Sequence, residues 1–281
     1  MTSILKKGNL VRWTAFLMLA LMFSGQILPA AAKVSLGAAE KLGPRVMAAE
    51  YLVKASALLS RDDAKHNFFI GLWYHKTHKL AKAEEYYRRA IELDPKIANT
   101  HYQLARVFFA SGKLNKALEE INQESEVNPV NKRSYYIRGL TLGYLGRYAE
   151  AELSFKEFLK TPLAQQSNGW GGYVDLGWVL MKQKKYEDTL WILKEAEGLF
   201  APNTWVYNGL GSAYFSIKDY AKAEEYYQKA YDGAKTMTVE EWLAAYPAHD
   251  PRTAEDGIRQ IIATLEKNLA LTEEKRDQKN P

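Results

Sequence analysis

The apolar residues of the chain fall at helical spacing, and the same arrangement returns every 34 residues from Ala64 onward. In the first window Gly71 and Tyr74 lie on one helical stretch, and Ala83 and Tyr87 lie on the next. A two-helix unit of this size cannot bury its apolar stripe alone, so neighbouring units must stack on one another. The pattern therefore predicts an array of helix hairpins.

Five windows share this phase once four extra residues, 166–169, are set aside. Small residues recur at window positions 8, 20 and 27, where two helices can approach closely. Large residues recur at positions 4, 7, 11 and 24 and fill the space beside them. The predicted units are 64–97, 98–131, 132–165, 170–203 and 204–237.

The segment AEEYYRRAIELDP at 83–95 resembles the second helix of a tetratricopeptide repeat, and the period matches the two-helix units of that family. The resemblance extends over about residues 41–271. It implies an all-α fold, a right-handed superhelical solenoid of antiparallel helix hairpins. It also implies protein binding, although the family serves many unrelated partners.

The flanks of the array predict capping elements. Residues 33–63 read as an N-terminal capping helix region, and 238–272 as a C-terminal degenerate repeat with capping helices. Thr238 and Glu241 form a capping-box pattern that opens a short helix ending at Pro247. Residues 273–281 are charged, and we expect them to form a frayed tail.

Residues 1–32 have the pattern of a secretory signal peptide. Basic residues at the start precede an apolar run at 13–28, and Ala30 and Ala32 supply the small residues for cleavage before Lys33. The run is short for a bilayer span of roughly 20 residues. An uncleaved anchor remains the alternative, and it is the one case in which we expect membrane contact. In both cases the repeats lie outside the cytoplasm.

Charge and cysteine content exclude several kinds of partner and of chemical site for this protein. The formal charge of +5 comes largely from Lys6, Lys7 and Arg12, so the exported part is nearly neutral. Without a basic block, nucleic acid is not an expected partner. The chain has no cysteine, which excludes disulfides, thiolate metal sites and cysteine nucleophiles.

We find no pattern that calls for a cofactor, a metal or catalysis. His75 and His78 lack a carboxylate at fixed spacing, and we interpret the histidines of the first two windows as surface residues without a metal. Glu84 and Glu85 recur as a pair at 224–225, which indicates a solvated helix face.

The family resemblance implies a concave groove lined by the first helix of each unit. The corresponding positions are rich in aromatic residues and arginine, which supply much of the energy of protein interfaces. This composition suits an extended or helical peptide with apolar anchors. The alternative, that these rings pack between hairpins, stays open. The candidate groove residues are Phe68, Tyr102, Arg106, Arg133, Tyr136, Trp178, Trp205 and Asn208.

The sequence thus favours an exported adaptor that binds a protein or peptide partner and assembles an envelope or secretion complex. We expect it in the periplasm, free or anchored to the inner membrane by residues 13–28. A second hypothesis is a self-assembling structural protein, in which the caps of one copy dock into the groove of the next. A third, the regulatory arm of an enzyme, is disfavoured because no stretch of the exported part is left to form a catalytic domain.

Overall fold

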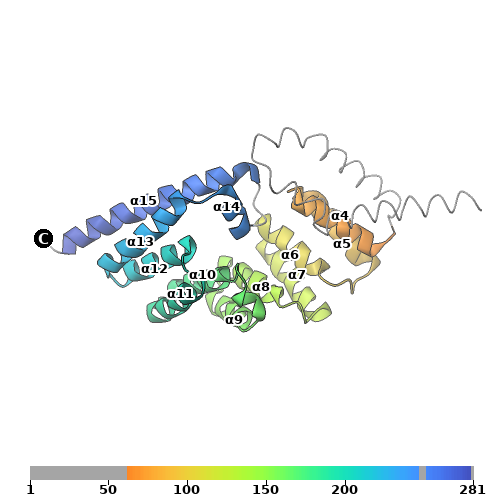
Figure 1. Cartoon of the computed structure of the whole chain (residues 1–281). Coiled ribbons are helices and arrows are strands. Elements are labelled where there is room, and N and C mark those ends of the chain that lie inside the picture. Colours follow the sequence, from red (N-terminus) through yellow and green to blue (C-terminus); the bar gives the residue numbers. More distant parts are fainter. Residues whose placement is uncertain (1–61, 247–250, 280–281) are drawn as a thin grey trace, which may run out of the picture. The chain divides into compact units, whose positions relative to one another are not determined.

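The computed structural model describes residues 62–246 and 251–279 (Figure 1). All regular structure in these ranges is helical, without a strand, and the predicted all-α solenoid of helix hairpins is confirmed. The expected signal segment and the helix before residue 62 lie outside the described ranges. No helix within them combines the length and the apolar character that crossing a membrane requires.

The helices follow one another through short turns. They are α4 (Ala64–Lys76), α5 (Leu80–Leu93), α6 (Thr100–Ala110), α7 (Leu114–Val127), α8 (Arg133–Tyr144), α9 (Tyr148–Leu159), α10 (Trp170–Lys182), α11 (Tyr186–Phe200), α12 (Thr204–Ser216), α13 (Tyr220–Lys235), α14 (Val239–Ala245) and α15 (Ala254–Lys279). Contacts divide the chain into two compact units, the first up to Lys113 with residues 126–128, the second made of 114–125 and 129 onward.

The first unit contains the hairpin of α4 and α5, with α6 packed on it. Asp63 caps α4, because its side chain accepts a hydrogen bond from the backbone N–H of His66 at 2.9 Å. Tyr87 and Phe108 are fully buried in this unit. At the surface Glu84 accepts hydrogen bonds from Arg88 of its own helix and from Lys113.

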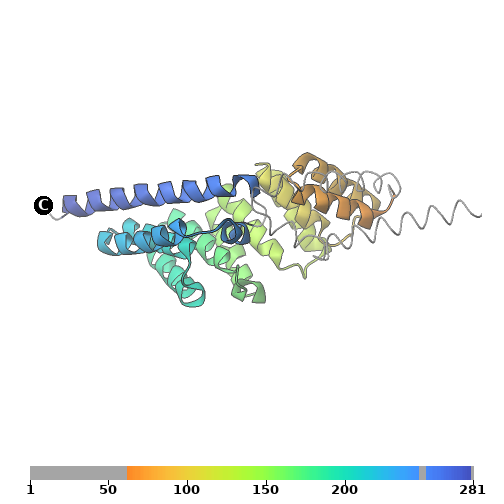
Figure 2. The ribbon, with the colours of Figure 1, turned by 45° about the horizontal axis from the view of Figure 1, so that its top comes forward.

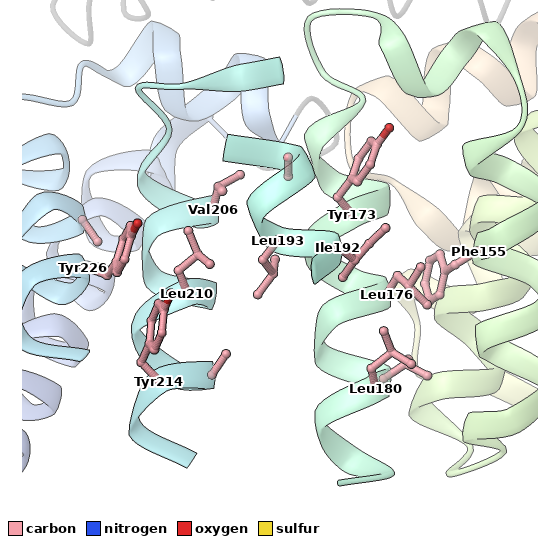
Figure 3. Packing of buried hydrophobic residues seen from close by; sticks show 14 of the residues in the cluster. Phe155, Tyr173, Leu176, Leu180, Ile192, Leu193, Val206, Leu210, Tyr214 and Tyr226 are labelled. Carbon is pink, nitrogen blue, oxygen red and sulfur yellow. The ribbon is translucent and has the colours of Figure 1, made fainter. Parts of the chain in front are cut away.

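The second unit has a continuous apolar core that runs from α8 to α13 and includes Leu265 of α15. Figure 3 shows Phe155, Leu176, Leu193 and Leu210 on successive helices, each almost fully buried. Burying a side chain of this size stabilises a fold by about 1.5–3 kcal/mol. This core holds α8, α10 and α12 at fixed positions beside one another.

Glycine sets the distance between the two helices of several hairpins. A Cβ added at Gly211 would lie 2.5 Å from the Tyr227 ring, and one added at Gly139 would lie 2.9 Å from the Phe155 ring. Gly71 meets Tyr87 in the same way at 2.6 Å. Window positions 8 and 24, which the repeat marked as small and large, are therefore in direct contact in these hairpins.

The glycine-rich segment between α9 and α10 allows a close backbone approach. A short 3-10 helix at Pro162–Gln165 precedes it. A Cβ added at Gly169 would lie 2.0 Å from the carbonyl oxygen of Ala164, which no rearrangement of a side chain could relieve. Only glycine fits at this position, and the turn it permits starts α10 at Trp170.

The C-terminal helices cover the end of the second unit. The Thr238 hydroxyl accepts a hydrogen bond from the N–H of Glu241, whose carboxylate accepts one from the Thr238 N–H, so the predicted capping box is confirmed. α15 then runs along α13 (Figure 2). Residues 273–279, which we expected in a frayed tail, continue this helix, and Arg276 pairs with Glu224 of α13.

Candidate functional site

The candidate groove residues of the first unit lie on α4 and α6. Phe68 is partly buried and packs on the ring of Tyr87, with ring centroids 6.0 Å apart, so it belongs to the hairpin interior. The Arg106 guanidinium lies 5.8 Å from the centre of the Tyr102 ring, and Arg106 donates a hydrogen bond to Gln103. Tyr102 and Arg106 therefore form one partly buried cation–aromatic pair.

The histidines of this unit differ from our interpretation. His66, His75 and His101 are buried, so they are not surface residues. Burial, together with the nearby positive charge of Arg106, lowers the pKa of His75 to about 4, which leaves the ring neutral. The His75 ring meets the Tyr87 ring edge-on, with centroids 6.3 Å apart. In the described part of the chain no group of His, Asp and Glu is arranged to hold a metal.

In the second unit the first helices bring several aromatic residues and one acid together. The Tyr136 hydroxyl, on α8, donates a hydrogen bond of 2.7 Å to Oδ2 of Asp175 on α10. The Tyr136 ring packs against Phe158, at 5.2 Å between centroids. A Cβ added at Gly171, one turn before Asp175, would lie 3.3 Å from the Tyr136 hydroxyl oxygen, so the two helices approach closely there.

Further aromatic side chains on α10, α12 and α14 pack in a row. Trp170 and Trp205 stack at 4.6 Å and 15°, and Trp205 meets Tyr246 edge-on at 5.7 Å. Tyr246 also packs on Trp242 at 4.6 Å. We call Tyr136, Trp170, Asp175, Trp205 and Tyr246 the aromatic face of the second unit.

The aromatic face places a carboxylate in an unfavourable environment. Burial raises the pKa of Asp175 to about 6, and the hydrogen bond from Tyr136 opposes that shift only in part. Burial also raises the pKa of the Tyr246 hydroxyl, and the nearby Asp175 carboxylate raises it further. No ion pair joins Asp175 to a basic residue among the residues that the structure describes.

The remaining candidates lie at different places on the same helices. Trp178 packs on Tyr144 at 5.4 Å and on Tyr148 at 6.3 Å, so part of its ring serves the contact between hairpins. Asn208 lies one turn after Trp205, and its side-chain oxygen is buried without a hydrogen-bond partner. Arg133 is exposed in the first turn of α8.

Asp175, Trp170 and Tyr246 were not among the residues that the sequence singled out. A lone acid in the apolar segment WGGYVDLGWVLMK was the available signal. The groove positions that the family resemblance implies do not include position 6 of a unit, and Asp175 occupies that position in the unit 170–203. Tyr246 follows the last complete unit, so the repeat frame assigns it no position.

Two family models match the chain. One, described as anaphase-promoting complex, cyclosome, subunit 3, matches residues 76–158, and one described as tetratricopeptide repeat matches residues 206–232. An uncharacterized protein of Methanocaldococcus jannaschii is 33% identical over 76 residues, which is 27% of this chain and 71% of that protein.

Two further relatives are much longer proteins. A tetratricopeptide repeat and J domain-containing co-chaperone of Cryptococcus neoformans is 32% identical over 27% of this chain and 14% of its own length. The human protein O-mannosyl-transferase TMTC3 is 29% identical over 62% of this chain and 18% of its own length. The chain thus spans less than a fifth of either relative.

Several solved structures share the fold of this chain. A tetratricopeptide repeat protein from Parabacteroides merdae superposes with a TM-score of 0.60 at 19% identity, over 80% of this chain and 91% of that one. PilW, a type IV pilus biogenesis factor, superposes with a TM-score of 0.57 at 17% identity, over 73% of this chain and 91% of PilW. YrrB, a repeat protein with an unusual peptide-binding site, superposes with a TM-score of 0.53 at 17% identity, over 64% of this chain and 91% of YrrB. At these identities the likeness establishes the fold alone.

Proposed function

Because this chain belongs to the tetratricopeptide repeat family, we propose that it is an extracytoplasmic adaptor whose aromatic face binds a protein partner through an extended or helical segment. The family fold is a protein-interaction scaffold, generally non-catalytic, and the proposal assigns no catalysis to this chain. The observation that carries the proposal is the row of partly exposed rings on α10, α12 and the C-terminal end of α14, together with the Asp175–Tyr136 hydrogen bond beside it.

The chemistry of this row suits an interface. Tryptophan and tyrosine present large rigid surfaces, and they dominate the energetic centres of protein interfaces. The Trp170, Trp205 and Tyr246 side chains contact one another but keep part of their surface accessible. A partner side chain laid on these rings would bury apolar area without any rearrangement of the core.

The proposed location and pathway rest on the first 32 residues and on the neighbours in structure. The signal-peptide pattern supports export, with an uncleaved anchor at 13–28 as the alternative. PilW is described as a pilus biogenesis factor, and YrrB as having a peptide-binding site. The first description supports a role for this chain in assembling an envelope or secretion complex, and the second supports the binding of a peptide.

Replacing Trp205 with alanine should weaken partner capture at least about fivefold, because an interface anchor of this size contributes about 1–2 kcal/mol or more. The measurement is affinity capture from an envelope extract with immobilised protein, quantified against bait concentration. The matched control is Glu225→Ala on the exposed side of α13, which should capture as the unchanged protein does. If Glu225→Ala loses the partner while a folded Trp205→Ala keeps it, the binding surface lies elsewhere.

A further inference from the structure

The second unit contains two buried or partly buried carboxylates with very different surroundings. Glu152 on α9 accepts hydrogen bonds from Lys156 at 2.6 Å, from Lys185 at 2.7 Å and from Gln183 at 2.8 Å. Asp175 receives one hydrogen bond, from the neutral Tyr136 hydroxyl. Glu152 is therefore a completed structural ion pair, whereas Asp175 keeps an oxygen without a partner in the described part of the chain.

The groups around Asp175 are aromatic. Tyr136 holds one oxygen, and Trp170 lies on the same helix, α10. The Trp170 ring stacks on Trp205, which meets Tyr246, and the Asp175 charge helps to raise the pKa of Tyr246. The faces of aromatic rings carry negative electrostatic potential and attract cations. A carboxylate beside such rings, with no cation of its own, has the composition of a cation-binding site.

We propose that Asp175 and the adjoining rings of the aromatic face form a subsite for a lysine or arginine side chain of the bound partner. This inference rests on the proposed function and names the chemistry of one anchor. The basic head group pairs with the Asp175 carboxylate, and its aliphatic stem lies along the rings, as long basic side chains do on apolar surfaces. Asp175 then determines specificity, and Tyr136 positions its carboxylate.

Other occupants fit the site less well. A divalent metal needs several oxygen or nitrogen ligands, and the described residues offer no such group here. An acidic side chain would meet the negative charge of Asp175. A purely apolar side chain would leave that carboxylate unpaired and more deeply buried than before, which costs free energy. The buried Asn208 oxygen, on the same helix as Trp205, adds another acceptor and no positive charge.

The test is selection from a bead-displayed library of random nonapeptides, N-acetylated and C-amidated, with the purified protein. Peptides retained by the unchanged protein should be enriched at least threefold in lysine or arginine next to apolar residues. Asp175→Asn should weaken binding of the selected peptides at least tenfold. Asp188→Asn, the same change at an exposed position of α11, should leave binding unchanged.

The outcomes separate this inference from the proposed function. Retention of apolar peptides without basic residues would overturn the basic subsite and leave peptide binding intact. Undiminished binding by Asp175→Asn would overturn it as well. Retention of no peptide above the background of bare beads would contradict the proposed function itself. The composition of the peptides that the unchanged protein selects does not depend on the folding of any variant.

Discussion

The Gly211→Leu variant should lose about 3 kcal/mol or more of unfolding free energy and unfold the hairpin of α12 and α13. The first added carbon would already lie 2.5 Å from the Tyr227 ring, and the rest of a leucine side chain has no space in that contact. Tyr227 is itself buried, so it cannot swing aside. Because each hairpin supports its neighbours, the loss should extend to α15, which packs on α13. Urea unfolding followed by circular dichroism measures the change.

Gly198→Leu is the matched control. It makes the same substitution within α11, at a position where an added Cβ meets nothing within 4 Å. Leucine also favours helix over glycine by up to about 1 kcal/mol, so stability should stay equal or rise slightly. Equal unfolding curves for the two variants would show that glycine does not set the hairpin spacing.

Replacing Asp175 with asparagine should raise the free energy of unfolding near pH 7–8 by about 1–3 kcal/mol, because one pKa unit corresponds to about 1.4 kcal/mol. The folded-state pKa of Asp175 lies above the ordinary 3.8, at about 6. The unchanged protein is therefore relatively more stable below pH 4 and loses that contribution as the pH rises through 6. The gain of the variant should vanish in acid. The measurement is urea unfolding of both proteins between pH 3.5 and 8.

Glu152→Gln should behave in the opposite way. Burial alone would raise the pKa of Glu152, but the hydrogen bonds from Lys156, Lys185 and Gln183 outweigh it and lower the pKa to about 2. Its contribution is present above the ordinary 4.5 and is lost as the pH falls toward 2. Glu152→Gln should therefore lower the free energy of unfolding by about 1–3 kcal/mol at neutral pH.

The Asp175→Asn prediction has a clear contrary outcome. If that variant lowers the free energy of unfolding at neutral pH, Asp175 serves the fold rather than a ligand.

The fold could be predicted from the sequence because its repeat period, its small residues and its capping pattern all indicate the same array of helix hairpins. The period, the small residues such as Gly139 and Gly211, and the capping box at Thr238 each specify a local contact that the structure contains. The C-terminal helix continues beyond our expectation, and Arg276 near its end pairs with Glu224, 52 residues earlier in the chain. No local pattern reports such a pair.

The candidate site was less accessible to sequence reasoning. An aromatic residue at helical spacing fills a core and lines a surface equally well, so the pattern could not separate Phe68, which packs on Tyr87, from Trp205. Asp175 acquires its role only through Tyr136 of the preceding hairpin and Tyr246 beyond the last complete unit. These relations depend on how hairpins stack, which the period alone does not specify.

Photo-crosslinking in the producing cells tests the central claim, that the aromatic face of the second unit is the partner-binding surface. Benzoylphenylalanine placed at Trp205 retains an aromatic side chain in the row of rings. The matched position is Trp191 on α11, an exposed tryptophan outside the aromatic face, with 68% of its surface accessible. We predict a discrete crosslinked adduct from position 205 and none from position 191. An adduct from position 191 with none from position 205 would contradict the account.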